Sequence, residues 1–560
     1  SPRRSKRLSC NGECGMCAAD RVPRHSWLRQ MGLVDQRRIA SMQLSLDGSD
    51  EGLRLLLTQL DQLGAARSRK GCVTIQRGPE TALKADLLGG LLYNEAETWG
   101  ELALRFLSNG MDVRLSEDSV AADMWVGKPA DPLPSTPPRL WLMHGNGKAL
   151  VGSGSMEGIG GSTIESTFID APTLVCGTSV LLHRLLRELG MFWAQPVTDR
   201  WLTLTARLDG VEPTDATRLI TSAFGPGTAT WTSDGLGSLV RFRLPLESTP
   251  EKLLTFLEQQ CSTPAPPLEV PLDVGPFPAL SQDGTISFDR QEIPESLKDV
   301  RAIILGVGGL GSWAAPLLLN GCDKGTTVLT LIDGDDEVEA HNLNRQVLYD
   351  SRSLGVPKAV AAKEILTRRF GLEDGAIVAV PVPMGAQHVC TETVVHDCEE
   401  ISLTEIVGAA DTQFDEAIVE GLDSMQLALS CLDNQLARTL LNKACHERGR
   451  VMVNGGGEGV VGIVETFGDD SCMVCRYGAQ EARAVERVSC QEEGERPVTA
   501  IVTTTAYVGA MMAAVALCVL ARQRGYEVRI PVARDWVDGL VSERAEGRLP
   551  WMEGGCGGHL

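Results

Sequence analysis

The second half of the chain alternates short apolar runs with helix-length segments. The apolar runs lie at 302–307, 328–333, 376–382, 427–433 and 451–456, and each is short enough to be a buried strand. Strands separated by helices are typical of a doubly wound, Rossmann-like parallel sheet. We therefore expect an α/β domain from residue 286 to residue 560.

The first half follows a different pattern, in which helical and strand periodicities are mixed. Leucines three and four positions apart predict an amphipathic helix at 51–66, and alternating residues predict strands at 201–210 and 239–246 around a helix at 214–224. We expect an additional α/β or α+β domain here. The remaining predicted segments are a polar, cysteine-containing arm at 1–40, this accessory domain at 41–268 and a proline-rich linker at 269–285.

The longest apolar stretch runs from residue 500 to residue 521. Its length would suit a membrane span, but three threonines and a tyrosine dilute it and no second span accompanies it. We interpret it as a buried helix that also lines a subunit interface.

Composition narrows the classes of function. The 560 residues are 43% hydrophobic and 22% charged, as in ordinary globular proteins. A net charge of -21 argues against a nucleic-acid partner, because phosphate backbones attract clustered Lys and Arg. Sixteen cysteines without a recognisable signal peptide favour a reducing, cytoplasmic location.

A glycine-rich turn follows the first predicted strand of the second half. Gly306, Gly308, Gly309 and Gly311 form a G-x-G-G-x-G pattern that opens a helix, and Asp333 ends the next strand. Such glycines let backbone N–H groups approach a phosphate, and the carboxylate can bind a ribose hydroxyl. These features alone fit NAD as well as ATP. A second glycine-rich stretch, at 151–162, lacks the Lys-Ser/Thr ending of a P-loop and is predicted to be a simple loop.

Charged residues beyond the second strand favour ATP. Arg345 and Lys358 would neutralise a triphosphate and the leaving pyrophosphate, which a nicotinamide site has no need to do. Asp433 ends a later strand, where its carboxylate can hold Mg2+.

The order of these motifs closely resembles the ThiF/MoeB/E1 family of adenylating enzymes. GVGGLG is followed by D-x-D, NLNRQ, G-x-P-K, and LDN with a later arginine. The resemblance implies that Asp333, Asp335, Asn342 and Gln346 bind or support the nucleotide, that Arg345 and Lys358 clamp its phosphates, and that Asp433 binds Mg2+. It further implies that Arg290, of an R-Q pair before the first strand, reaches the γ-phosphate in a partner subunit.

The cysteine-rich C-terminal part carries two further expectations. Cys472 and Cys475 form half of a tetrahedral site, and Cys556 with His559 repeats the spacing, so that a Cys3His zinc site is predicted by analogy with family members. Cys490 lies where the family carries its acceptor cysteine, and a thiolate there could form a thioester. Two weaker metal candidates are Cys10, Cys14 and Cys17 with His25, and His388, Cys390, His396 and Cys398 in an acidic insertion that is more naturally a docking segment.

Together these patterns predict an E1-like activating enzyme that adenylates the C-terminal glycine of a ubiquitin-like protein with ATP and Mg2+. The layout resembles E1-like proteins of bacterial ubiquitin-like conjugation operons, whose N-terminal domain is often an inactive adenylation-like domain. That resemblance implies a homodimer and an E2-like partner. The alternatives are adenylation of a peptide or sulfur carrier without a thioester, a non-catalytic scaffold and, more distantly, an NAD oxidoreductase.

Overall fold

The structure is a computed structural model in which two large sheets and two small ones are distinguished. It describes residues 33–83, 96, 98–117, 121–128, 131–134, 136–145, 148–153, 167–189, 201–208, 229–233, 238–245, 272–273, 294–334, 337–384, 393–396, 399–402, 415–433, 435–468, 472–473, 500–526, 528, 530, 533–537 and 540–544.

The sheet of the second half has the order β13-β12-β11-β16-β17-β18-β19-β20. Its first five strands run parallel and the last three antiparallel. The five predicted strands and the doubly wound fold are therefore confirmed. The strands are β11 (Arg301–Leu305), β12 (Val328–Ile332), β13 (Ile377–Val380), β16 (Leu427–Ser430), β17 (Val451–Glu458), β18 (Val461–Phe467), β19 (Ala533–Val537) and β20 (Leu540–Arg544).

Helices connect these strands as the pattern predicts. They are α7 (Gly311–Asn320), α8 (Lys358–Phe370), α9 (Asp415–Ser424), α10 (Gln435–Glu447) and α13 (Val502–Gln523), with short 3-10 turns η2 (Ala340–Asn342) and η3 (Ser351–Ser353). Apolar side chains of the two sheet faces form separate buried clusters, one towards α7, α8 and α13 and one towards α9 and α10.

The first half repeats the same strand order. Its sheet runs β3-β2-β1-β4-β5 in parallel, and then adds β6 and β10 antiparallel. The elements are α1 (Leu33–Ala40), β1 (Gln43–Gly48), α2 (Asp50–Leu63), β2 (Cys72–Ile75), α3 (Trp99–Ser108), β3 (Val113–Leu115), β4 (Met124–Gly127), β5 (Leu140–Gly145), β6 (Lys148–Ser153), α4 (Asp170–Glu188) and β10 (Leu272–Asp273). The chain thus contains two Rossmann-like sheets with one topology.

Two small antiparallel sheets complete the described elements. β7 (Trp201–Leu208), β9 (Ser238–Pro245) and β8 (Ala229–Ser233) pair in that order, which confirms the strands predicted at 201–210 and 239–246. β14 (Thr393–His396) and β15 (Glu399–Ser402) form a hairpin within the predicted insertion. The helix predicted at 214–224 lies outside the described residues.

The structure shifts the predicted boundaries of the first domain. Residues 33–40 of the predicted arm form α1, whose Ile39 is fully buried in the core. Within the predicted linker, β10 adds a strand to the edge of the first sheet next to β6. The glycine-rich stretch begins inside β6, so its first residues are strand and not loop. Burial of Ile39 therefore adds α1 to the domain at one end, and backbone pairing with β6, which proline content does not reveal, adds β10 at the other.

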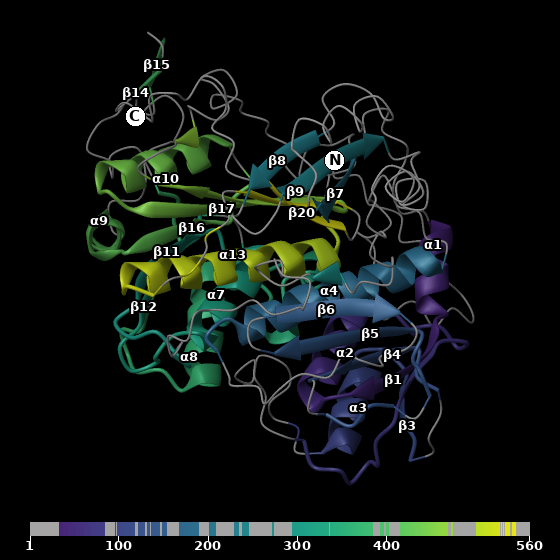
Figure 1. Ribbon diagram of the computed structural model, residues 1–560. Coiled ribbons are helices and arrows are strands. Elements are labelled where there is room, and N and C mark those ends of the chain that lie inside the picture. The colour runs from purple at the N-terminus through teal and green to yellow at the C-terminus, as the bar shows by residue number, and fades with distance from the viewer. Residues whose placement is uncertain are drawn as a thin grey trace, which may run out of the picture.

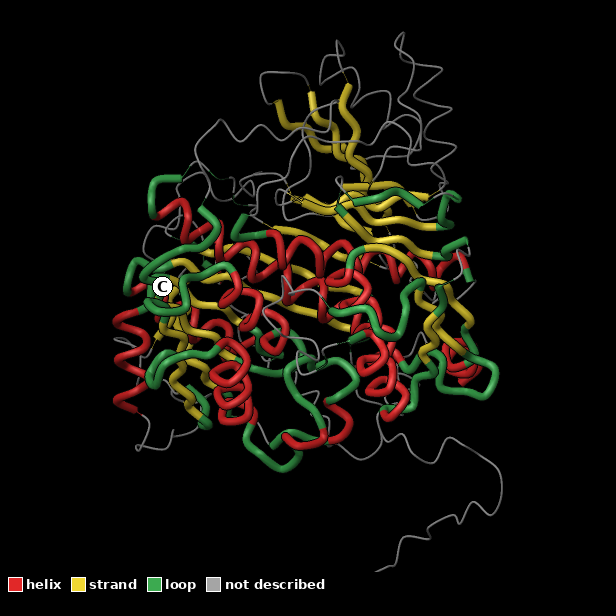
Figure 2. The backbone as a smooth tube through the Cα atoms, turned by 90° about the horizontal axis from the view of Figure 1, so that it is seen from below, coloured by secondary structure: helices red, strands yellow, loops and turns green. Residues whose placement is uncertain are grey.

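Helix α13 joins the two halves. Figure 1 shows it beside α4, the equivalent helix of the first half, and Figure 2 shows helices gathered in the middle of the molecule. His183 of α4 lies 3.3 Å from the Thr503 hydroxyl, and the Cys176 thiol donates to the Tyr507 carbonyl. Among the described helices α13 alone is long and apolar enough to span a membrane, and it is buried throughout. The predicted buried helix is confirmed, but the surface expected to meet another subunit is covered by α4 of the same chain.

Candidate functional site

The glycine turn sits at the carboxyl end of β11, next to the point where the strand order reverses between β11 and β16. Ligands of doubly wound sheets bind at this position. Gly306 has a φ of +87°, and a Cβ placed on it would lie 2.7 Å from the Cys431 carbonyl oxygen. A Cβ on Gly311 would lie 2.0 Å from the Gly306 carbonyl oxygen. Both positions therefore require glycine for the turn itself.

The middle of the turn is more open. A Cβ placed on Gly308 would meet only the Gln346 side-chain nitrogen, at 3.7 Å. On Gly309 it would contact Thr505 at 3.2 Å and the Arg345 guanidinium at 3.9 Å. The fold does not need glycine at Gly308, so its absent side chain leaves room for a ligand to approach the backbone.

Asp333 anchors the turn to the neighbouring strand. It follows β12 directly and is almost fully buried. One of its carboxylate oxygens accepts the Val307 N–H at 2.5 Å, while the Gly306 N–H donates to the Ile332 carbonyl at 2.8 Å. The carboxylate predicted to bind a ribose therefore also fixes the glycine turn. Asp335, its predicted companion, lies outside the described residues.

The segment after β12 folds into two 3-10 turns that bring Asn342, Arg345 and Gln346 towards the glycine turn. The Asn342 side-chain oxygen accepts the Glu339 N–H at 2.9 Å, so it caps η2. Arg345 donates to the His341 carbonyl at 3.2 Å and to the Asn344 side chain at 3.0 Å. Its own carbonyl accepts the Trp313 indole N–H at 3.1 Å. These contacts hold the segment against α7.

Gln346 differs from its neighbours because it is buried with an unused acceptor. Its side chain is 2% exposed, and its carboxamide oxygen has no hydrogen-bond partner among the described residues. Leaving a buried carbonyl unpaired costs free energy. A ligand hydroxyl or amino group at the glycine turn would remove that cost.

Lys358 begins α8. It is only 6% exposed, and no side chain caps the helix at the preceding Pro357. A cation at a helix N-terminus is unfavourable with respect to the helix dipole, whereas an anion there would interact with the dipole and the ammonium together. The charge at this position thus favours a bound phosphate.

Asp433 follows β16 and is exposed at the same edge of the sheet. Arg438 of α10, part of the motif but given no role from sequence, donates to the Leu432 carbonyl at 3.0 Å. Its guanidinium also lies 3.3 Å from a Cβ placed on Gly456 of β17. An open carboxylate at a strand end, beside an ordered backbone, is a suitable ligand for Mg2+.

Tyr349 is a residue that sequence reasoning missed. Its apolar neighbours suggest only a core position, but its hydroxyl lies 2.8 Å from the Val307 carbonyl oxygen and 3.1 Å from that of Lys358. Burial and the nearby Asp333 charge raise the pKa of Tyr349 well above its ordinary value. The hydroxyl therefore remains a donor at any physiological pH.

Two described cysteines of the second half, Cys431 beside the glycine turn and Cys445 in the last turn of α10, are poor nucleophiles. Burial raises the pKa of Cys431, and it raises the pKa of Cys445 to about 12. Both thiols stay protonated at neutral pH, when only a thiolate attacks efficiently. The predicted nucleophile Cys490 and the predicted Arg290 lie outside the described residues.

The predicted zinc ligands are only partly described. Cys472 is fully buried, whereas Cys475, Cys556 and His559 lie outside the described part of the chain. Of the weaker candidates only His396 is described, on β14. No group of three or more His, Cys, Asp and Glu residues within the described ranges could hold a metal.

The equivalent edge of the first sheet carries opposite chemistry. Arg77, just beyond β2, pairs with Asp47 at 3.1 Å and with Asp50 at 3.5 Å. Glu51 pairs with Lys128 at 2.9 Å and lies 3.8 Å from the buried His144, whose pKa is lowered to about 3 by burial. In the first half, carboxylates lie at the strand end where the second half has glycines. These carboxylates already neutralise the nearby cations, Arg77 and Lys128.

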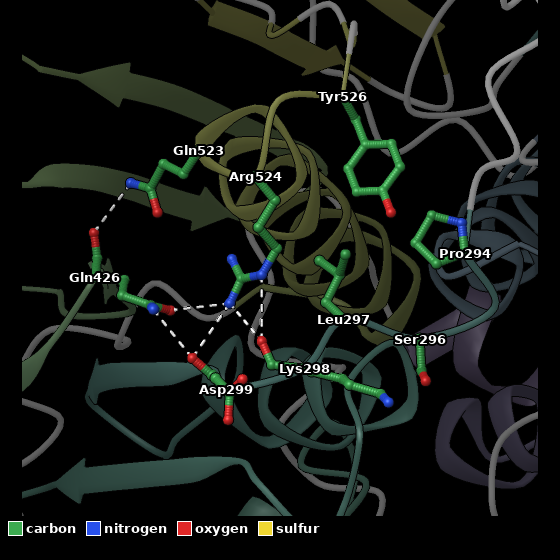
Figure 3. Close-up of a pocket in the computed structure, with 9 residues that line it drawn as sticks. All are labelled: Pro294, Ser296, Leu297, Lys298, Asp299, Gln426, Gln523, Arg524 and Tyr526. Atoms are coloured by element: carbon green, nitrogen blue, oxygen red, sulfur yellow. Dashed lines mark hydrogen bonds between the residues drawn. The ribbon is translucent and has the colours of Figure 1, made fainter.

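A cavity of about 520 Å³ lies at the opposite, amino-terminal edge of the second sheet (Figure 3). Arg524 of its wall donates to the carbonyl of Lys298 at 2.6 Å and to that of Leu520 at 2.8 Å. The Arg524 guanidinium thus joins the segment before β11 to the C-terminal end of α13. None of the predicted site residues lines this cavity.

We predict that two substitutions in the glycine turn have different consequences. Gly311→Ala should lower the free energy of unfolding by about 3 kcal/mol or more, because its methyl group overlaps backbone. Gly308→Ala should leave the thermal midpoint nearly unchanged but weaken ATP binding about tenfold, because its methyl group occupies ligand space. Thermal unfolding and titration calorimetry measure both, and equal ATP affinity in Gly308→Ala would contradict the assignment.

Comparisons with known proteins show which sequences this chain is similar to. The ThiF family model matches residues 284–531. The chain is 27% identical over 207 residues to a molybdopterin-synthase adenylyltransferase of Salmonella typhimurium, which covers 35% of this chain and 69% of that protein. It is 25% identical over 230 residues to the adenylyltransferase and sulfurtransferase UBA4 of Lodderomyces elongisporus, covering 40% of this chain and 43% of the relative.

A third relative is the ubiquitin-like modifier-activating enzyme 5 of Branchiostoma floridae, 28% identical over 204 residues. That match covers 36% of this chain and 44% of the relative, so the chain spans less than half of this protein and of UBA4. The matched family segment contains the glycine turn, Asp333, Arg345, Lys358 and Asp433. Residues 284–531 therefore resemble the ThiF family, and the similar proteins are named as adenylyltransferases and a ubiquitin-like modifier-activating enzyme.

Proposed function

We propose that the second half of the chain adenylates the C-terminal carboxylate of a small, glycine-ended, ubiquitin-like protein with ATP. The observation that carries the proposal is the grouping of the glycine turn, Asp333, Lys358 and Asp433 around the carboxyl ends of β11, β12 and β16. Support comes from relatives whose names are those of adenylyltransferases and of a ubiquitin-like modifier-activating enzyme.

Each group has a proposed task. The glycine turn and the N-termini of α7 and α8 receive the phosphates, and Asp333 binds the ribose while it holds Val307. Arg345 and Lys358 stabilise the negative charge that develops on the leaving pyrophosphate. Asn342, Asp335 and Gln346 support the nucleotide, and Asp433 would hold Mg2+, which supplies further charge neutralisation when bound.

The chemistry proposed is an in-line displacement. A carboxylate oxygen of the partner's terminal glycine attacks the α-phosphorus of ATP, and the bond from that phosphorus to the β-phosphate bridging oxygen breaks. The products are an acyl adenylate and pyrophosphate. Positioning and charge stabilisation by the chain supply the rate enhancement, since the phosphoryl centre needs little covalent help.

A thioester step is the finer part of the proposal. The Cys490 thiolate would attack the acyl carbon and expel AMP, its proton having passed to solvent, and the acyl group would then pass to an E2-like partner. The zinc set of Cys472, Cys475, Cys556 and His559 would fix the C-terminal part. Burial of Cys472 is consistent with a structural ligand. If the step is absent, the chain instead adenylates a peptide or sulfur carrier.

The first half is proposed to be an inactive adenylation-like domain. The shared strand order and the pairing of α4 with α13 support an internal pseudo-dimer, in which the first half replaces a second subunit. Arg77 and the carboxylates of Asp47, Asp50 and Glu51 exclude a triphosphate from its sheet edge. An accompanying homodimer would need another surface.

The adenylation proposal predicts ATP–pyrophosphate exchange that depends on a glycine-ended partner. Asp433→Asn should lower the exchange rate about 100-fold, because charge at the reacting phosphates is no longer neutralised. The exposed Asp423, which pairs with Arg448 at 2.8 Å in the same half, provides a control: Asp423→Asn should keep the rate. Tight partner binding without exchange in the wild type would favour the scaffold alternative.

The thioester proposal predicts a partner adduct that dithiothreitol cleaves. Cys490→Ala should abolish this adduct in non-reducing gels while pyrophosphate exchange continues, because adenylation precedes thiol attack. Cys72→Ser, a partly exposed cysteine of β2 in the first half, is the matched control and should retain the adduct. A wild-type enzyme that exchanges pyrophosphate but never forms the adduct would instead support peptide or sulfur-carrier adenylation.

The pseudo-dimer proposal predicts one ATP bound per chain. Calorimetric titration of the wild type should give a stoichiometry of one, and Lys358→Met should remove most of the heat while Arg77→Met does not alter it. Two sites of similar affinity, or loss of binding in Arg77→Met with a normal thermal midpoint, would show that the first half also takes nucleotide.

A further inference from the structure

The Tyr349 hydroxyl bridges two elements of the candidate site. It lies within hydrogen-bond distance of the Val307 carbonyl oxygen, at 2.8 Å, and of the Lys358 carbonyl oxygen, at 3.1 Å. Val307 belongs to the glycine turn after β11, whereas Lys358 begins α8 on the far side of the 337–357 segment. A single buried O–H is therefore shared between the two places where phosphates are expected.

Val307 is held from both sides of its backbone. Its N–H donates to Asp333 at 2.5 Å, and its carbonyl accepts from Tyr349. A continuous path of hydrogen bonds thus runs from Asp333 through Val307 and Tyr349 to Lys358. Because every member is buried, water does not compete for these bonds and each restricts the next.

Lys358 needs such support. The helix that it begins lacks a side-chain cap, and the buried ammonium stands against the helix dipole. Its placement is therefore not fixed by a local capping motif. The bond from Tyr349 to its carbonyl instead ties the first turn of α8 to the glycine turn.

We propose that Tyr349 is a positioning residue that sets the separation between the glycine turn and Lys358, and through Lys358 determines the affinity for the phosphates of ATP. The inference rests on the proposed function, since it assumes that this site takes ATP. It assigns Tyr349 no contact with the nucleotide. Its effect should therefore depend on the presence of phosphates and of the Lys358 ammonium.

The test is Tyr349→Phe, which removes the hydroxyl and keeps the ring. ATP affinity should fall about tenfold, because a displaced cation loses much of a charge-assisted contact, while adenosine affinity should stay within about twofold. Titration calorimetry, with adenosine measured by competition, gives both. Equal losses for ATP and adenosine would show a general effect on structure and overturn the proposal.

A double-mutant cycle isolates the path through Lys358. In a Lys358→Met background, Tyr349→Phe should reduce ATP affinity by less than about twofold, because the ammonium that it positions is gone. Fully additive losses would overturn the proposal. Tyr507→Phe is the control. This buried tyrosine of α13 stacks on Trp536 with 4.4 Å between the ring centroids, and the variant should keep the wild-type ratio of ATP affinity to adenosine affinity.

If Tyr349→Phe does not fold, Tyr349→His replaces it in the test, because its ring retains a hydrogen-bond donor. A loss of about threefold in ATP affinity without a loss in adenosine affinity supports the proposal. Equal losses of affinity for both ligands overturn it. A wild-type protein that binds no ATP would refute the proposed function. Normal ATP binding with an unchanged affinity ratio in the Tyr349 variant would refute only the role of Tyr349.

Discussion

The packing of α13 against the glycine turn is the contact on which the arrangement of the site depends. At Gly509 the helix approaches so closely that a Cβ there would lie 2.6 Å from the Leu310 carbonyl oxygen. One turn further, the Met512 sulfur lies 2.1 Å from the place that a Cβ on Gly455 would take, and 3.9 Å from the Cys431 thiol. The same helix packs on α4, so one buried element supports the site and joins the two halves.

Although α13 is mostly apolar, its threonine side chains form hydrogen bonds that position the neighbouring strands and loops. The Thr504 hydroxyl accepts the Trp536 indole N–H at 3.1 Å and lies 3.1 Å from the Gly459 carbonyl oxygen. Thr505 lies 3.5 Å from the Arg345 carbonyl oxygen. Threonine is also smaller than leucine and therefore fits where the helix packs closely. The threonines that dilute the apolar sequence of this helix thus also fix strands and loops around it.

The two sheets illustrate that topology does not determine chemistry. Both end their first strands at the same kind of edge, but the second half places glycines and the buried Lys358 there, and the first half places carboxylates paired with Arg77 and Lys128. An anion is attracted to the former and repelled from the latter. The division of labour between the halves therefore rests on a few side chains at strand ends and not on the fold.

The sequence alone determined the five strands of the second sheet, the glycine turn, the carboxylate at Asp333 and the buried helix, because periodicity and motif spacing are local properties. It could not reveal that the first half repeats the same sheet, since its first strand is not followed by the G-x-G-G-x-G pattern and its second strand does not end in an aspartate. Nor could it show that β10 belongs to that sheet or that α4 covers α13. Tyr349 was hidden for the same reason: its role depends on two carbonyl oxygens, at Val307 and Lys358, that only the tertiary fold brings within reach of one hydroxyl.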